Sequence, residues 1–478
     1  MPQSTVAPQS ASGPQRAVRP RPAVRPPRAV WAWACVGLAG SILVTLAGPR
    51  LAGGSVRWWF EGGGGVPAFY AGIVALSLAW IGLGRSAPTV RQLWIIAVIW
   101  SAPLVAGAPL FSQDVYSYLA QGALVHLGLD PYHQAPAVLA EHGQAHVLGA
   151  VSPFWRHTTA PYGPLFLWIV SGLGALAGSN LVVGALLVRL LELAGLVLLG
   201  VCAPRLARGL GADGARATWF VLLSPLVLLE LVAAAHNDLL MIGLLVAGVS
   251  LAIERRVLPA IALCALAATV KLPAAAAIPF ILVAFGDRRI VVRGVLVAAG
   301  VVLAVSLVSG LGLGWISSSV FSTPEKVRLA ITPATALGWT AAQVVPVGAR
   351  GLESAFGAIA FAGSLVFGLL LLWHARPGNM VRYLAFALIA VAVCGPAAWP
   401  WYLTWGLVLL AACPRIQSSR ALVVTAAVGA LLVKADGILA FPLHTAPVFV
   451  VLYVAIVVVA SRRRAAVTAP RLRPVAES

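Results

Sequence analysis

The chain alternates between long apolar runs and short polar segments. A helix that crosses a bilayer needs roughly 17–25 predominantly apolar residues, and many of the runs reach that length. The long runs lie near 30–48, 66–84, 92–110, 180–203, 217–234, 291–314, 352–374 and 444–460, and shorter ones, several interrupted by proline, fill the gaps. The pattern predicts an all-α polytopic membrane protein with about 14 transmembrane helices.

One further apolar run, 162–178, is long enough to span, but the arginines argue against it. The short segments between apolar runs carry pairs and triplets of arginine, which are typical of cytoplasmic loops. If 162–178 spanned the membrane, the arginine segments from Arg205 onward would move to the outer side. We therefore expect this run to lie in the outer interface or to re-enter the membrane, and we expect both chain ends inside.

The same topology places a scattered set of polar groups on the outer side. The set comprises Asp114, the turn 161–164, His236 to Asp238, Lys271, the loop containing Arg328, Trp399 to Tyr402, and Lys434 with Asp436. None of these residues was used to assign the arginine loops. The sequence thus predicts one arginine-rich face and an opposite face on which polar side chains converge.

Composition agrees with a membrane protein. The 478 residues are 60% hydrophobic and 10% charged, whereas a soluble domain has roughly 45–50% apolar and about 25% charged residues. The net charge of +19 comes from arginines in the short loops, which favours anionic lipid headgroups and argues against a nucleic-acid partner. The five cysteines lie in or beside apolar runs without CxxC spacing, so we expect neither disulfides nor a cysteine metal site.

The chain divides into four predicted parts. Residues 1–29 are rich in proline and arginine and predict a disordered cytoplasmic tail. Residues 30–84 supply two transmembrane helices that we interpret as an added module, and residues 85–460 supply the main transmembrane domain with an outer loop over 111–179. Residues 461–478 are a second cytoplasmic tail.

Asp114 is one of few acidic residues and stands where an apolar run ends. Ser112 predicts a helix N-cap, which would put Asp114 in the first turn, where the helix dipole favours an ionised carboxylate. If 113–127 is helical, Asp114, Tyr118 and Gln121 share one face. The alternative is that Asp114 only caps a helix at the membrane interface.

Two further polar groups interrupt apolar runs. His236, Asn237 and Asp238 lie together at membrane depth, where a charge costs about 2.5–3.5 kcal/mol on insertion scales and usually has a partner or a function; the alternative is a hairpin turn that caps the next helix. Lys271 precedes the helix-breaking Pro273. It suits a phosphate partner, and the alternative is a lysine that extends to the interface.

The remaining candidates are weaker. Trp399, Trp401 and Tyr402 can stack on sugar rings, although aromatic residues at an interface more often form a belt. Arg189 and Glu192 lie within one span and are expected to pair with each other. The histidines of the outer loop lack zinc-ligand spacing, so we expect no metal.

An outward-facing aspartate beside membrane-embedded cations suits group transfer from a lipid phosphate. The lipid tail would lie in the bilayer, the phosphate against a cation, and the carboxylate would take a proton from the acceptor hydroxyl. The rival class is a multi-pass transporter or flippase of lipid-linked sugars. Such a protein is expected to show repeated halves with broken helices, and no internal repeat is evident.

Several motifs in one order resemble a known family. They are Ser112-Gln-Asp-Val-Tyr-Ser-Tyr-Leu-Ala-Gln-Gly122, Gly128-Leu-Asp-Pro-Tyr132, Ala160-Pro-Tyr-Gly-Pro164, His236-Asn237-Asp238, the lysine before Pro273, Pro400-Trp-Tyr402 and Lys434-Ala-Asp-Gly437. Over roughly residues 90–445 the chain resembles the actinobacterial polyprenyl-phosphate-mannose-dependent α-(1→6)-mannosyltransferases, which are integral-membrane GT-C glycosyltransferases.

The resemblance implies a GT-C-like bundle with outer-face juxtamembrane helices in the plasma membrane and an extracytoplasmic active site. It implies inverting transfer of mannose from polyprenyl-phosphate-mannose to the 6-hydroxyl of an α-mannan glycolipid, in lipomannan and lipoarabinomannan, without a cofactor; a GT-C enzyme for another sugar is an alternative. Asp114 would be the base. We expect Lys271, His236 and Arg328 near the donor phosphate, and the sugar sites at Tyr118, Tyr162, Asn237, Asp238, Trp399, Trp401, Tyr402 and Asp436.

Overall fold

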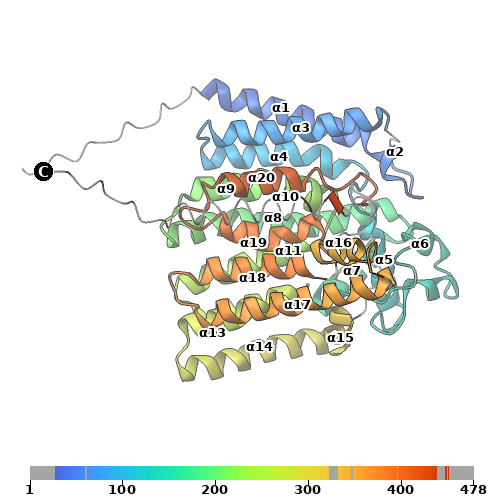
Figure 1. The fold of residues 1–478 in the computed structure, drawn as a ribbon. Helices are drawn as coiled ribbons and strands as arrows, with labels where there is room; N and C mark the ends of the chain where they lie inside the picture. Colours follow the sequence, from blue (N-terminus) through green and yellow to red (C-terminus); the bar gives the residue numbers. More distant parts are fainter. Residues whose placement is uncertain are drawn as a thin grey trace, which may run out of the picture.

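The computed structural model describes residues 27–59, 62–321, 332–345, 348–395, 397–438, 447–448 and 451. Within these ranges the elements are all helical, and most of them run side by side in one bundle (Figure 1). The described residues therefore confirm the predicted all-α class. Several predicted features lie outside the described residues, namely residues 1–26 of the N-terminal tail, the C-terminal tail, Arg328 and most of the span 444–460. Residues 27–29 of the predicted N-terminal tail instead begin helix α1.

The bundle is built from thirteen helices of seven residues or more among the described residues. They are α1 (Pro27–Ala47), α3 (Gly65–Gly84), α4 (Val90–Ala106), α8 (Leu181–Gly209), α9 (Gly214–Leu223), α11 (Asp238–Ile253), α12 (Val257–Ala268), α13 (Ala277–Phe285), α14 (Arg288–Val308), α17 (Ala349–Trp373), α18 (Met380–Cys394), α19 (Thr404–Leu410) and α20 (Arg420–Gly429). Among these helices, α1 packs on α3, α8 on α11, and α17 on α18.

A second set of helices connects or covers the bundle. They are α2 (Pro49–Ala52), α5 (Asp114–His126), η1 (Pro136–Ala140), α6 (Ala145–Ala150), α7 (Pro164–Ala177), α10 (Pro225–Val227), η2 (Leu228–Ala233), η3 (Leu272–Ala276), α15 (Gly314–Phe321), α16 (Pro333–Ala341) and η4 (Pro400–Leu403). Of these, η2 is a π-helix, a distortion that occurs frequently at functional sites.

Six of the described helices are long and apolar enough to cross a membrane. They start at Arg28, Gly65, Leu181, Gly214, Arg288 and Arg350, and they identify a membrane protein. The predicted total of about 14 spans stays a prediction. Of residues 162–178, Pro164–Ala177 form α7, whose 14 residues extend about 21 Å, compared with the roughly 30 Å of a hydrocarbon core. Other apolar helices of the bundle are equally short, so the non-spanning position of this run also stays a prediction.

Polar residues start several of these helices where the sequence leaves an apolar run. Thr89 and Gln92 form a capping box at the start of α4, and the Asn180 side chain accepts hydrogen bonds from the first amides of α8. Asp287 caps α14 in the same way. Each side chain satisfies backbone N–H groups that a helix leaves unpaired at its start.

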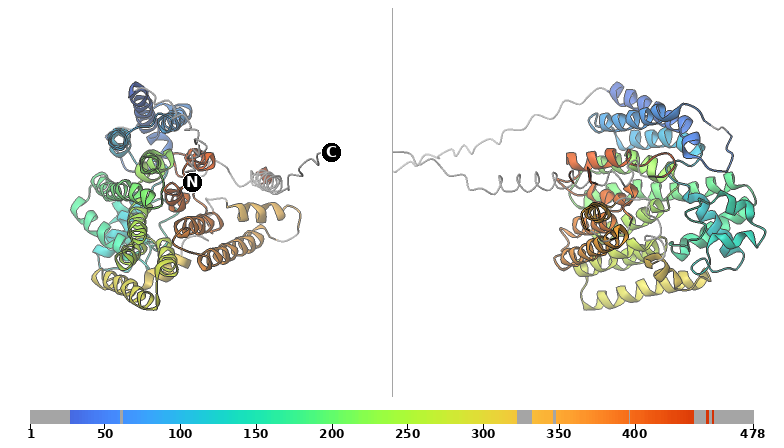
Figure 2. Two further views of the ribbon diagram at one scale, coloured as in Figure 1. Left: turned by 90° about the vertical axis from the view of Figure 1, so that its left-hand side faces the viewer. Right: turned by 45° about the vertical axis from the view of Figure 1, so that its right-hand side comes forward.

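The two ends of the bundle differ. The connections α13–α14 and α17–α18 lie at one end, and Arg288 and Arg376 belong to them (Figure 1). The helices α2, α5, α6 and α7 lie at the other end, where they form a cap on the bundle (Figure 2). The arginine-bearing connections and the segment that contains Asp114 therefore occupy opposite ends.

The segment 111–179 packs on two cores. Buried apolar side chains of α5, η1, α6 and the residue after α6 form a small core, namely Ala120, Leu124, Leu139, Val147 and Val151. Other buried residues of the segment, among them Val115, Tyr118 and Phe166, belong to the main core. The segment is thus held against the bundle and can present side chains from fixed positions.

Two local predictions were wrong. Helix α5 begins at Asp114 with Gln113 at the N-cap position, although the Ser112 hydroxyl still accepts a hydrogen bond from the Asp114 amide at 3.0 Å. Arg189 does not pair with Glu192. Its guanidinium donates to the carbonyls of Val105, Gly107 and Ala233, while Glu192 accepts from the Leu240 amide.

The physical reason for the Arg189 contacts lies in the helix ends around it. Helix α4 ends at Ala106 and the π-helix η2 ends at Ala233, and the last carbonyls of a helix lack regular helical partners. A guanidinium has five donors in a fixed fork, so it can satisfy several carbonyls at once. Arg189 thereby ties the segment leading to Asp114 to the segment leading to His236.

Candidate active site

A cavity of about 370 Å³ opens between the 111–162 segment and the membrane helices. It brings together residues from five distant parts of the sequence. Of the predicted site residues, Asp114, Tyr162, Lys271, Trp399, Trp401, Tyr402 and Asp436 line it. The structure therefore brings these seven predicted residues together around one cavity.

Asp114 is the first residue of α5, and its side chain is 15% exposed. The start of a helix carries a partial positive charge that favours a carboxylate. The chain reaches this position through Phe111, which adopts a left-handed conformation with φ +64°. A non-glycine residue in that region is strained, and such strain gathers at functional sites.

His236 is the closest described basic group to the Asp114 carboxylate. Its Nε2 lies 3.6 Å from Asp114 Oδ2, and its Nδ1 contacts the Glu230 carbonyl. Because a carbonyl only accepts, Nδ1 carries a proton, and Nε2 then faces the carboxylate. That contact is attractive only when the pair holds one further proton, either on Nε2 or on the carboxyl.

The backbone and an aromatic ring hold His236 in this position. Ala235, the preceding residue, is left-handed with φ +59°. The imidazole stacks on the Trp401 indole at 4.1 Å between ring centroids, and Trp401 in turn stacks on Trp399 at 4.7 Å. His236 itself is 1% exposed, so it lies behind the cavity wall.

Lys271 lines the cavity and is anchored from behind by Asp238. The ammonium donates to both Asp238 oxygens, at 2.9 and 2.8 Å, and the Trp405 indole N–H donates to Asp238 Oδ1 at 2.6 Å. The Tyr402 ring lies 4.6 Å from the ammonium. Since an ammonium has three hydrogens, Lys271 keeps one for a ligand in the cavity.

Tyr162 belongs to the Pro161-Tyr-Gly-Pro164 turn, which packs directly on the segment before Lys271. The Gly163 amide donates to the Val270 carbonyl at 2.9 Å. A Cβ at Gly163 would lie 2.1 Å from the Thr269 carbonyl oxygen, so only glycine fits this close approach. Burial, followed by the neighbouring Asp114 carboxylate, raises the pKa of the Tyr162 phenol, which keeps it a hydrogen-bond donor.

Asp436 reaches the cavity from the far end of the sequence. The Phe111 amide donates to the Ala435 carbonyl at 2.9 Å, so the segment with Asp436 is joined to the start of α5. Gly437, with φ +83°, approaches the Phe111 carbonyl closely. Lys434 lies 3.6 Å from the Asp436 carboxylate.

Some predicted residues do not line the cavity. Tyr118 is buried beneath it, with its ring edge-on to Tyr162 and Phe166. Asn237 is fully buried, and neither polar atom of its side chain has a partner among the described residues. Asp238 and His236 act on the cavity through Lys271 and Asp114, respectively. No group of three or more possible metal ligands occurs in the described part of the chain.

Sequence reasoning missed several parts of the wall. Trp405 holds Asp238, and Trp155 and Phe361 line the cavity. The sequence offered one clue to Trp405, which lies three residues after Tyr402, and in the structure the two rings stack at 4.5 Å. The sequence offered no clue to Trp155 or Phe361, since their neighbours in sequence carry no motif.

Comparison with known proteins gives the same family over most of the chain. The family profile described as "Alpha-(1->6)-mannopyranosyltransferase, N-terminal domain" matches residues 33–287, and the profile described as "MptB C-terminal domain" matches residues 331–464. The chain belongs to the alpha-(1->6)-mannopyranosyltransferase family. The N-terminal profile includes the helices α1 and α3, which precede the segment with Asp114.

Individual relatives agree. "Alpha-(1->6)-mannopyranosyltransferase A" of Mycobacterium tuberculosis is 35% identical over 84% of both chains. A "probable alpha-(1->6)-mannopyranosyltransferase" of Mycolicibacterium smegmatis is 34% identical over 71% of this chain and 69% of its own. No solved structure matches. The protein is accordingly a membrane-embedded glycosyltransferase, an α-(1→6)-mannosyltransferase, and the cavity around Asp114 is its candidate active site.

Proposed function

We propose that this mannosyltransferase transfers mannose from polyprenyl-phosphate-mannose, with inversion, to the 6-hydroxyl of an α-mannan acceptor in lipomannan or lipoarabinomannan. The reaction would take place on the extracytoplasmic face of the plasma membrane. The observation that carries the proposal is that Asp114 and Lys271, 157 positions apart in sequence, line one cavity. A base and a cation at one reacting centre suit the departure of a phosphate and the attack of a hydroxyl.

The cavity wall fits a lipid-linked donor. Beside Lys271 the wall is apolar, with Leu272, Pro273, Phe361 and Val391, and these residues belong to helices of the bundle. A polyprenyl chain would lie along this side while its phosphate accepts the remaining hydrogen of Lys271. The aromatic residues Trp399 and Tyr402 would then border the mannosyl group.

The proposed reaction is a single displacement. Asp114 accepts the proton of the acceptor 6-hydroxyl while that oxygen bonds to the mannosyl C1 from the side opposite the phosphate. The C1–O bond to the phosphate breaks, and polyprenyl phosphate leaves with the bonding electron pair beside Lys271. His236 contacts Asp114 at 3.6 Å, a position that favours supporting the carboxylate over binding the phosphate.

The test uses membranes that contain the protein, labelled polyprenyl-phosphate-mannose and a short α-mannoside. Elongated, labelled product that forms with wild-type protein and not with Asp114→Asn supports the proposal. A second donor carrying glucose on the same lipid tests sugar identity. Equal transfer from both donors would overturn the choice of mannose donor, and no transfer from either would overturn the lipid-phosphate donor.

A further inference from the structure

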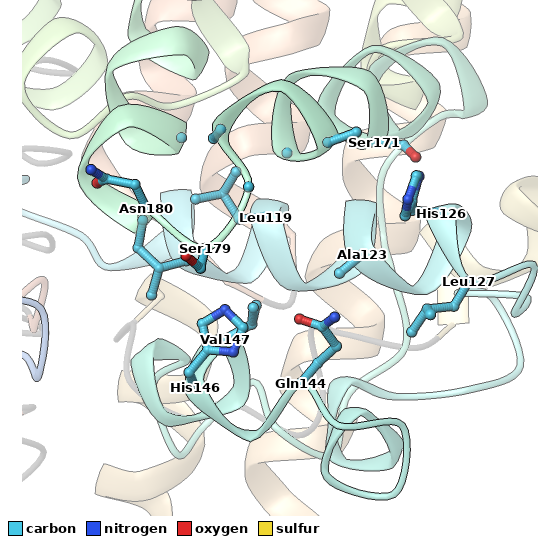
Figure 3. Close-up of a pocket in the computed structure, with 16 residues that line it drawn as sticks. Leu119, Ala123, His126, Leu127, Gln144, His146, Val147, Ser171, Ser179 and Asn180 are labelled. Carbon is cyan, nitrogen blue, oxygen red and sulfur yellow. The ribbon is translucent and has the colours of Figure 1, made fainter.

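A second cavity, of about 260 Å³, opens at the other end of α5. It lies between the end of α5, the start of α6, α7 and the start of α8. Hydrogen-bonding side chains on its wall are His126, Gln144, His146, Ser171, Ser179 and Asn180. Figure 3 shows Gln144 and His146 reaching across from the start of α6, with Ser171 and Asn180 on the side of α7 and α8.

These side chains have unused hydrogen-bonding capacity. His126, Gln144, His146 and Ser171 form no side-chain hydrogen bond with another residue in the described part of the chain, and the Ser171 side chain is nevertheless buried at 8% exposure. Of the remaining side chains, Asn180 uses its Oδ1 to accept hydrogen bonds from the first amides of α8. The Ser171 hydroxyl lines the cavity, so it is free to bond water or a ligand there.

The lining of this second cavity favours a neutral ligand over a phosphate. No aspartate, glutamate, lysine or arginine lines it within the described residues. A phosphate or other anion would call for arginine or lysine, and an acyl chain would not use the free hydrogen-bonding groups. A neutral, polyhydroxylated ligand fits both properties of the wall.

We propose that the second cavity binds mannosyl residues of the acceptor chain that lie behind the reacting sugar. The proposal rests on the proposed function. Asp114 and His126 are the first and last residues of α5, and twelve residue steps at 1.5 Å separate them by about 18 Å. One sugar cannot reach both cavities, so the second cavity contributes only when the acceptor carries several mannosyl residues.

Glycine positions on α7 allow a matched test. A Cβ at Gly174, which lines the second cavity, meets no atom within 4 Å, and neither does one at Gly172, two residues earlier on an exposed face of the same helix. Gly174→Phe fills the cavity without a backbone clash, whereas Gly172→Phe adds the same ring outside it. Both changes replace a helical glycine, so their intrinsic effects on α7 cancel.

The experiment measures KM for an α-mannoside with one sugar and for an α-(1→6)-linked hexasaccharide, with polyprenyl-phosphate-mannose as donor. For Gly174→Phe we expect the ratio of the hexasaccharide KM to the mannoside KM to rise about tenfold, and for Gly172→Phe we expect the wild-type ratio. Gln144→Ala, which deletes one hydrogen-bonding group and adds no bulk, should raise the ratio roughly two- to tenfold and serves if Gly174→Phe does not fold.

The outcomes separate this inference from the proposed function. An unchanged ratio in both Gly174→Phe and Gln144→Ala overturns the second cavity as an acceptor site, although transfer itself continues. A KM that changes equally for both acceptors and depends on the anionic lipid content of the membranes overturns it in favour of a lipid-headgroup site. Absence of transfer by wild-type protein would contradict the proposed function. In that case, equilibrium binding of the hexasaccharide to Asp114→Asn protein tests independently whether the second cavity binds the acceptor.

Discussion

The two cavities at the ends of α5 differ above all in the charged residues that line them. The cavity at Asp114 contains a carboxylate, a lysine anchored by a second carboxylate, and a cluster of aromatic rings. The cavity at His126 is lined by histidine, amide and hydroxyl side chains and small residues, with no aspartate, glutamate, lysine or arginine among the described residues. Charge at membrane depth is costly, and in the proposed reaction it lies where a phosphate and a proton move. Recognition of a neutral chain needs only hydrogen bonds, so the second cavity can do without charge.

The same contrast separates two buried cations. Lys271 faces a cavity and keeps a donor free, whereas Arg189 spends its guanidinium on three backbone carbonyls and lines neither cavity. The lysine belongs to the site, and the arginine holds the segments that carry the site. These two basic residues thus have different roles according to what their donors contact.

The largest effect is expected at the charged cavity. Asp114→Asn keeps the size of the side chain and removes its ability to accept a proton, and kcat should fall about 10²–10⁴-fold with donor binding retained. Single-turnover transfer in membranes measures it. Glu141→Gln, an exposed acidic residue of the same outer segment, is the matched control and should retain wild-type turnover. Wild-type turnover of Asp114→Asn would remove the base.

The second-largest effect is expected from substitution of Lys271. Lys271→Ala should raise the donor KM about tenfold to hundredfold by loss of a charged contact, and it should lower thermal stability because Asp238 is left buried and unpaired. The double variant Lys271→Met with Asp238→Asn removes the unpaired charge. We expect it to recover stability without recovering donor affinity, and recovery of both would show that Lys271 has only a structural role.

Arg189 should affect the charged cavity indirectly. Arg189→Met removes three hydrogen bonds to the segments before Asp114 and His236, and misplacement of the reacting groups should reduce kcat roughly tenfold to hundredfold while leaving the donor KM nearly unchanged. Arg189→Lys keeps the charge with fewer donors and should recover part of the loss. Turnover equal to wild type in Arg189→Met would contradict the positioning role.

The smallest effect is expected at the uncharged cavity. Ser171→Ala removes a hydroxyl that has no partner in the described part of the chain, so stability should stay within about 0.5 kcal/mol of wild type. The KM for a long acceptor should rise roughly two- to tenfold, the value of one hydrogen bond. Thermal unfolding and acceptor titration measure the two quantities. A stability loss without any change in KM would make Ser171 a structural residue.

Sequence patterns gave correct predictions at some positions and wrong ones at others. Apolar runs predicted the helical membrane class, which the described helices confirm. The arginine loops predicted a non-spanning 162–178, which stays a prediction. Motif residues such as Asp114 and Lys271 line one cavity. The N-cap of α5 was predicted one residue too early. The partner of Arg189 was predicted wrongly because its donors meet carbonyls at the ends of two other helices.

The amino-acid sequence by itself determined the class of the protein. Hydropathy sets which segments leave water, and the cost of burying charge makes each interrupted run conspicuous. Only the tertiary structure decided that His236 faces Asp114, that Asp238 lies behind Lys271, and that a second, uncharged cavity forms beside α7. These contacts join residues far apart in the chain, and no local pattern specifies which distant group a side chain will meet.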